Sequence, residues 1–272
     1  MRIIIIAVIM LFSAPAFALE MFTPVEQGAI IIGKTHPQNK IYFNNERIKT
    51  TNDGRFIIGV DRDAPASITI KEVRKDSIVT NHKIPVKKVN WKIQRIDGLP
   101  PAKVTAPAAE MPRIEQERKV MVAAKESSTT KIFPSCFAPP VKAKHRISGV
   151  FGSQRILNGE PKNIHVGLDF AAPVGVNVRA TAKGRVVLAY DEMYYNGKIV
   201  VIDHGFNVFS YYLHLSKISV KKGEFVKQGD KIGEIGTTGR STGPHLHFEI
   251  SVNNVKINPD FALKNSLCGD DK

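Results

Sequence analysis

Short runs of β-branched and apolar residues, separated by turn signals such as Asn52-Asp53-Gly54, dominate the hydrophobic pattern of the chain. Short strands at this spacing are typical of two-layered β structure. The strands expected from these runs are 29–32, 40–43, 56–60, 67–73 and 77–86 in the first part, and 176–180, 184–190, 198–203, 208–213, 231–236 and 245–252 in the second. We therefore predict a mainly β protein.

A stretch of different composition separates the two groups of strands. Four prolines lie between residues 100 and 112, interspersed with alanine, as is typical of a linker. Residues 113–125 are good helix formers and predict one short helix. The expected organisation is a small β-sandwich-like domain at 19–95, a proline-rich linker at 96–135 and a second, antiparallel β domain at 136–272.

Residues 1–18 have the three parts of a secretory signal peptide: a charged start at Arg2, an apolar core over residues 3–12 and a small-x-small ending at Ala16-Phe17-Ala18. The apolar core is too short to favour a membrane-spanning anchor. We therefore predict an exported protein with no membrane span once the signal is removed. The periplasm is the expected location, and the extracellular space is the alternative.

The chain is basic, with 39 Lys+Arg against 25 Asp+Glu and a formal net charge of +14. The excess is spread through both halves without a dense run of Lys and Arg, which argues against nucleic acid as a partner. A diffuse positive charge suits an acidic polymer, or it serves solubility alone.

Two cysteines, Cys136 and Cys268, bracket the second domain. An even pair in an oxidising compartment favours a disulfide, and two unrelated thiols are the alternative. Closing so long a loop would stabilise the fold, since it restricts the unfolded chain.

The segment 243–250 carries the strongest chemical signal. Its alternation of polar and apolar residues predicts a half-buried strand on which His245, His247 and Glu249 share one face. Two adjacent imidazoles on one face suit a metal or a reaction centre, and an exposed polar face without a task is the alternative.

A second histidine and a carboxylate lie upstream, at His165 and Asp169, with Gly167 between them arguing against a helix. An extended segment would place both groups on one side. Zinc binds histidine nitrogen and aspartate oxygen, and a catalytic site keeps three protein ligands with one position open for water. His165, Asp169 and one histidine of the 245/247 pair would make such a set, and the spacing does not decide which. The apolar strand at 211–215 adds a further histidine, His214.

These motifs in this order, His165-x-x-x-Asp169, a strand with Tyr212-x-His214-Leu, and the run at 238–247 ending in His-Leu-His, resemble the lysostaphin-type (LytM-like) zinc metallopeptidases of bacterial cell walls. The resemblance covers roughly residues 136–263. It implies an antiparallel β metallopeptidase domain with one zinc ion. The ligands it implies are His165, Asp169 and His247, with His214 and His245 as catalytic residues beside the metal.

Other residues near these motifs each have a functional and a structural interpretation. Glu249 either orients a ligand imidazole or forms a salt bridge at the strand end. The glycine-rich loop before His245 resembles the substrate-groove loop of that family, and ordinary turn chemistry is the alternative. His204 follows a strand in a turn, where a surface position is expected. The expected substrate-binding residues are Arg155, Asn158, Arg240, Ser241 and Thr242.

The function implied is a zinc-dependent endopeptidase that hydrolyses peptide cross-links of bacterial peptidoglycan, with metal-activated water and two assisting histidines. Peptidoglycan is the expected partner, and a regulatory protein is a second candidate. One alternative is a non-catalytic wall-binding protein that activates a separate amidase. The other is a wall-binding module with a structural metal, although such a site normally has four protein ligands.

Overall fold

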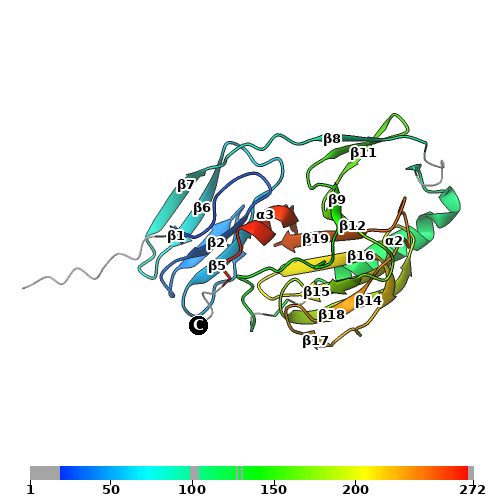
Figure 1. The fold of residues 1–272 in the computed structure, drawn as a ribbon. Helices are drawn as coiled ribbons and strands as arrows, with labels where there is room; N and C mark the ends of the chain where they lie inside the picture. The colour runs from blue at the N-terminus through cyan, green and yellow to red at the C-terminus, as the bar shows by residue number, and fades with distance from the viewer. Residues whose placement is uncertain (1–18, 99–103, 127, 130, 269–272) are drawn as a thin grey trace, which may run out of the picture.

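The computed structural model describes residues 19–98, 104–126, 128–129 and 131–268. The expected signal peptide, residues 1–18, lies outside the described residues. Within the described ranges, no helix has both the length and the apolar character needed to cross a bilayer. Strands dominate, as the sequence predicts (Figure 1).

Two antiparallel sheets form the amino-terminal part (Figure 1). The strand β6 shows why they form, since buried Ile68, Ile70 and Glu72 alternate with exposed Thr69 and Lys71. The first sheet has the order β1-β2-β5 and the second β4-β3-β6-β7. Their bounds are β1 (Glu20–Met21), β2 (Ile30–Lys34), β3 (Lys40–Phe43), β4 (Glu46–Ile48), β5 (Arg55–Gly59), β6 (Ser67–Val73) and β7 (Val79–Pro85).

The carboxy-terminal part is built on one large sheet with the order β17-β14-β15-β16-β19-β12-β9, to which β13, β18 and β20 are added. The bounds are β9 (Arg146–Gly149), β12 (Leu168–Ala171), β13 (Asn177–Arg179), β14 (Gly184–Met193), β15 (Gly197–Asp203), β16 (Val208–Ile218), β17 (Phe225–Val226), β18 (Lys231–Ile235), β19 (Leu246–Val252) and β20 (Val255–Ile257). A short helix, α3 (Pro259–Lys264), follows. The central strands are long and apolar because both faces of the sheet are covered.

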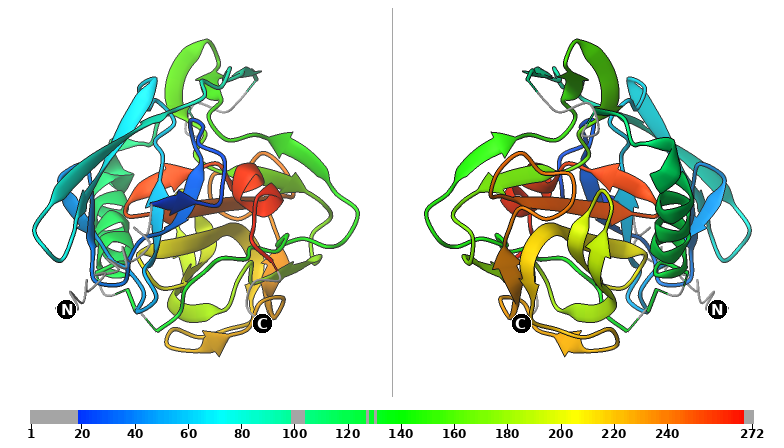
Figure 2. Two further views of the ribbon diagram at one scale, coloured as in Figure 1. Left: turned by 90° about the vertical axis from the view of Figure 1, so that its left-hand side faces the viewer. Right: turned by 90° about the vertical axis from the view of Figure 1, so that its right-hand side faces the viewer.

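The helix α2 (Met111–Ala123), preceded by the turn η1 (Ala108–Glu110), covers one of those faces, and it lies along one flank of the molecule (Figure 2). Its Val120 and Met121 pack against buried side chains of the strands, including Tyr211. Buried Glu117 accepts a hydrogen bond from the backbone N–H of Tyr194 at 2.9 Å. The helix expected at 113–125 is therefore present, shifted by two residues.

The apolar core continues from the amino-terminal sheets into the other face of the large sheet. At this seam Gly59 of β5 packs so closely that a Cβ atom there would lie 3.1 Å from Val252 and Ile257 side chains. Asn253 Nδ2 also donates to the Ile57 carbonyl at 3.3 Å. The two halves therefore share a packed interface.

The strand β8 (Ile93–Ile96) leaves the amino-terminal part and crosses above the seam (Figure 1). It pairs in parallel with β10 (Gln154–Leu157), which also pairs with β11 (Glu160–Ile164). The strand β8, which spans the expected boundary between the first domain and the linker, thus joins a small sheet of the carboxy-terminal part.

Cys136 and Cys268 form a disulfide with an S–S distance of 2.05 Å, joining positions 132 residues apart. The bond ties the start of the carboxy-terminal part to the segment that follows α3.

Candidate metal centre and its groove

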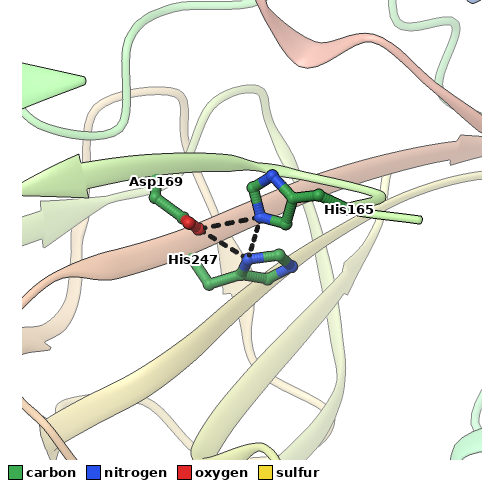
Figure 3. Close-up of side chains that lie close together, drawn as sticks. All are labelled: His165, Asp169 and His247. Atoms are coloured by element: carbon green, nitrogen blue, oxygen red, sulfur yellow. Dashed lines mark hydrogen bonds and ion pairs between the residues drawn. The ribbon is translucent and has the colours of Figure 1, made fainter. Parts of the chain in front are cut away.

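Two neighbouring antiparallel strands, β12 and β19, place Asp169 directly opposite His247, and His165 lies just before β12. His247 Nδ1 lies 2.7 Å from Asp169 Oδ1, His165 Nε2 lies 3.1 Å from the same oxygen, and the two nitrogens are 3.0 Å apart. The three side chains are buried and their donor atoms point toward one another (Figure 3).

Two glycines make room for this cluster. A Cβ atom on Gly149 of β9 would lie 2.2 Å from Asp169 Oδ2. A Cβ atom on Gly167 would lie 2.7 Å from the His247 ring and 2.6 Å from the Phe248 carbonyl oxygen. The strands can bring the three side chains together only because these positions lack side chains.

The hydrogen bonds on the far side of each imidazole determine which nitrogen faces the cluster. His165 Nδ1 lies 2.9 Å from the Val150 carbonyl oxygen, which can only accept, so this nitrogen carries the proton. His247 Nε2 lies 2.8 Å from Glu249 Oε1 and donates to that carboxylate. In their neutral forms both rings therefore turn an unprotonated nitrogen toward Asp169.

This arrangement fits a metal ion. Two imidazole lone pairs and a carboxylate oxygen repel one another unless a positive charge lies between them, and the set of donors is one that zinc prefers. Burial would raise the pKa of Asp169, but the neighbouring imidazoles of His165 and His247 hold it well below its usual range. Burial would lower the pKa of His247, yet Asp169 and Glu249 raise it to about 9. The centre therefore attracts positive charge.

A cation stands behind each of the two carboxylates. Arg155 Nη2 donates to Asp169 Oδ2 at 2.7 Å, and Lys256 pairs with Glu249 while its ammonium lies 3.6 Å from the centroid of the Tyr211 ring. Burial would raise the pKa of Glu249, but Lys256 and His247 lower it below its usual range. Arg155, which the sequence suggested as a substrate-binding residue, thus contacts Asp169 and helps to hold it.

His214 and His245 lie beside the cluster without joining it. The ring centroids of these two histidines are 4.8 Å apart, and that of His214 is 6.0 Å from that of His247. His214 Nδ1 donates to the Thr238 carbonyl at 2.9 Å, and His245 Nδ1 donates to the Gly243 carbonyl at 2.8 Å. Burial, helped by the neighbouring His247 and His245, lowers the pKa of His214 to about 3.

A bulge in β16 places His214. Its backbone has φ of +64°, and the pairing of β16 with β15 shifts register between Lys198 and Val200. A bulge of this kind changes the direction of a side chain, and this bulge lies at His214, whose ring is beside the ligand cluster.

An open groove of about 410 Å³ contains the cluster and both further histidines. Arg240 and Thr242 line it, and the Arg240 guanidinium lies 4.3 Å from the centroid of the Tyr195 ring. Ser241 also lines it, but its Oγ lies 3.2 Å from His245 Nδ1 and orients that ring. Asn158 does not line the groove; it lies in the turn between β10 and β11 with a backbone φ of +49°.

Two features of the structure were missed by sequence reasoning. Gln94 and Ile96 of β8 line the groove, although nothing in their local pattern indicates proximity to residues 60 positions later. His204 is fully buried, so the expected surface position is wrong. Its Nδ1 donates to the Lys183 carbonyl at 2.8 Å, and its Nε2 lies 2.7 Å from Ser210 Oγ.

In comparison with known proteins, residues 163–259 match peptidase family M23. Peptidoglycan DD-endopeptidases ShyA and ShyB of Vibrio cholerae are 46% and 44% identical over 121 and 111 residues, or 44% and 40% of this chain. These alignments span only 28% and 26% of those proteins' lengths. A solved peptidase M23 structure from Pseudomonas aeruginosa has a TM-score of 0.67 at 25% identity, covering 89% of this chain and 96% of that one. The similarity in fold therefore extends into the amino-terminal half.

Proposed function

We propose that this chain, whose residues 163–259 belong to peptidase family M23, is a zinc-dependent endopeptidase that hydrolyses peptide cross-links of bacterial peptidoglycan. The observation that carries the proposal is the convergence of three metal-binding donors and two further histidines in one open groove. The names of the Vibrio cholerae relatives support the substrate class.

His165, Asp169 and His247 would hold the ion, and Glu249 and Arg155 would fix the orientation of two of these ligands. A zinc ion with three protein ligands lowers the pKa of its water to near neutrality and polarises a carbonyl oxygen. This chemistry suits hydrolysis of a peptide bond.

His214 and His245 would handle protons. Carbonyl groups occupy the Nδ1 atom of each ring, so Nε2 is the nitrogen left for water or substrate in both. A neutral imidazole with a free Nε2 can accept a proton from the attacking water and pass it to the leaving amine. A backbone carbonyl holds Nδ1 of both rings, and Ser241 Oγ contacts only that of His245, so separate variants at the two histidines test their roles.

The bond that we propose is the D-Ala–diaminopimelate cross-link, in line with the DD-endopeptidase names of the relatives. The periplasm is the proposed site of action, because residues 1–18 have the composition of a signal peptide. The alternative, a non-catalytic activator of a separate amidase, has no need for paired histidines beside metal-binding donors, and this groove contains both.

Digestion of purified sacculi by the zinc-loaded protein tests the proposal. Mass spectrometry of the released muropeptides should show cross-linked dimers converted into monomers with new free amino groups on diaminopimelate. His247→Ala should lose bound zinc and this conversion, whereas His145→Ala, a change at an exposed histidine outside the groove, should keep both.

His214→Ala and His245→Ala should keep zinc but lose at least about 100-fold in rate, the usual contribution of proton transfer. If zinc-loaded wild-type protein leaves cross-links intact, while a separate amidase becomes faster in its presence, the activator alternative holds instead.

A further inference from the structure

A second cavity lies at the seam between the amino-terminal sheets and the large sheet. Its volume is about 660 Å³, larger than the groove at about 410 Å³. It is lined by residues 47–52 and Arg55 around β4 and β5, by residues 131–133, and by Lys183 and Phe206 of the carboxy-terminal part. We call it the basic cavity, and it shares no lining residue with the groove.

Positive charge distinguishes this cavity. Five of its lining residues are cationic, and none is Asp or Glu. The five are Arg47, Lys49, Arg55, Lys131 and Lys183.

Among the described residues, most of this charge has no carboxylate partner. Arg55 pairs with Asp53, with 3.1 Å between Nε and Oδ2. In the part of the chain that the structure describes, no carboxylate lies within 4.0 Å of the charged nitrogens of the other four residues. Lys49 instead donates to neutral oxygens, at 3.1 Å to Asn207 Oδ1 and 3.4 Å to the Ser128 carbonyl. Like charges gathered around one cavity repel, so an anion bound there would relieve that repulsion.

The cavity is also partly organised for a ligand. The Arg55 guanidinium lies 4.8 Å from the centroid of the Phe133 ring, which holds its plane in place. Hydroxyl and amide side chains of residues 50–52 stand beside the cations. Guanidinium groups match phosphate oxygens in pairs, and ammonium groups add point charges.

We propose that the basic cavity binds a ligand that carries two or more phosphate groups and contacts both halves of the protein. Four of these cations have no carboxylate within 4.0 Å among the described residues, and their charge exceeds what a single carboxylate or phosphate can neutralise. The ligand would be a soluble oligophosphate or a phosphorylated lipid headgroup, which share this chemistry. The proposal does not depend on the metal centre.

Inorganic triphosphate is the first probe, measured by calorimetry and by the shift in melting temperature. The test variant is Arg47→Gln/Lys49→Gln/Lys183→Gln. The matched control is Lys75→Gln/Lys83→Gln/Lys88→Gln, which removes the same charge near β7, at the opposite edge of the sheet from β4. We expect triphosphate to bind the wild type and the control equally, and the cavity variant at least tenfold more weakly. Added salt should weaken the binding.

The ligand-free cavity variant should melt no lower than the wild type, because removing like charges relieves repulsion. An unchanged or higher melting temperature therefore shows that weaker triphosphate binding comes from loss of the site and not from a damaged fold. Equal triphosphate affinity in the cavity variant and the control, or no binding to the wild type, would overturn the proposal.

Vesicles of phosphatidylcholine with and without phosphatidic acid distinguish the two sources. Sedimentation of the wild type with phosphatidic acid vesicles, prevented by triphosphate and lost in the cavity variant, would identify a lipid headgroup. Triphosphate binding without sedimentation would support the soluble oligophosphate.

Discussion

Gln94, on the strand that arrives from the amino-terminal half, accepts a hydrogen bond from Arg155 Nε at 3.2 Å. Its amide also donates to the Ser148 carbonyl at 3.3 Å, which holds the side chain in place. Arg155 in turn donates to the second oxygen of Asp169. A residue far from the ligands in sequence therefore helps to position the carboxylate at the metal centre.

Substitutions at Arg155 and Gln94 should weaken metal binding to different extents. Arg155→Gln takes away the direct partner of Asp169, and such partners typically contribute about 10–100-fold in metal affinity. Gln94→Ala removes only the hydrogen bond that holds Arg155, so it should lower metal affinity less, by about 2–5-fold. Competition with a chromogenic chelator measures both changes as zinc dissociation constants.

The control is Arg95→Ala, at the next position on β8, which is exposed and does not line the groove. It should bind zinc as the wild type does. Equal losses in Gln94→Ala and Arg95→Ala would mean that β8 acts through general stability alone.

Glu249→Gln tests the orientation of His247. The carboxylate accepts the His247 Nε2 proton at 2.8 Å and so leaves Nδ1 free toward the cluster. A neutral amide is a weaker acceptor, and its NH2 group can turn toward the ring instead. We expect about 10–100-fold weaker zinc binding and a matching loss of turnover at limiting zinc. Full zinc content and full turnover in this variant would contradict a role for Glu249 in orienting the ligand.

Gly167→Ala should damage the centre without changing any ligand. The new methyl group would meet the His247 ring at 2.7 Å and the backbone oxygen of Phe248 at 2.6 Å, so β12 and β19 would have to move apart. Overpacking of this kind costs about 1–3 kcal/mol of folding stability. Zinc content and the free energy of unfolding in urea would both fall. Gly243→Ala, where a Cβ atom meets nothing within 4 Å, should change neither.

The sequence predicted the parts of this site that depend on local pattern. Alternation in the segment after Pro244 placed the apolar side chains of β19 in the core, and Leu246, Phe248 and Ile250 are fully buried there. The mainly β fold followed from the same kind of pattern. These features were predictable because each depends on residues close together in the chain.

Features that depend on tertiary packing were not predictable. At the bulge, β16 has one more residue than the facing part of β15, and the pattern of a single strand does not reveal it. Arg155 lines the groove as expected, but its ion pair with Asp169 joins two different strands, β10 and β12, and neither strand's pattern reveals it. His204 was expected at the surface because its neighbours form a turn, yet the sheet buries it.

Buried His204 should make folding stability depend on pH. Burial lowers its pKa from 6.5 to about 4, against a small opposing effect of the Lys183 carbonyl and of Asp203. The unfolded chain therefore binds a proton near pH 6.5 that the native state does not bind until about pH 4. The resulting stability is present above pH 6.5 and is lost as the pH falls toward 4, by about 3 kcal/mol in total.

Urea unfolding of wild type and His204→Gln across this range isolates the effect. Both proteins share every other titrating group, so the difference in their free energies of unfolding should narrow by up to about 3 kcal/mol between neutral pH and about pH 4. A constant difference between wild type and His204→Gln across the range would show that His204 is already free to take up a proton in the native state.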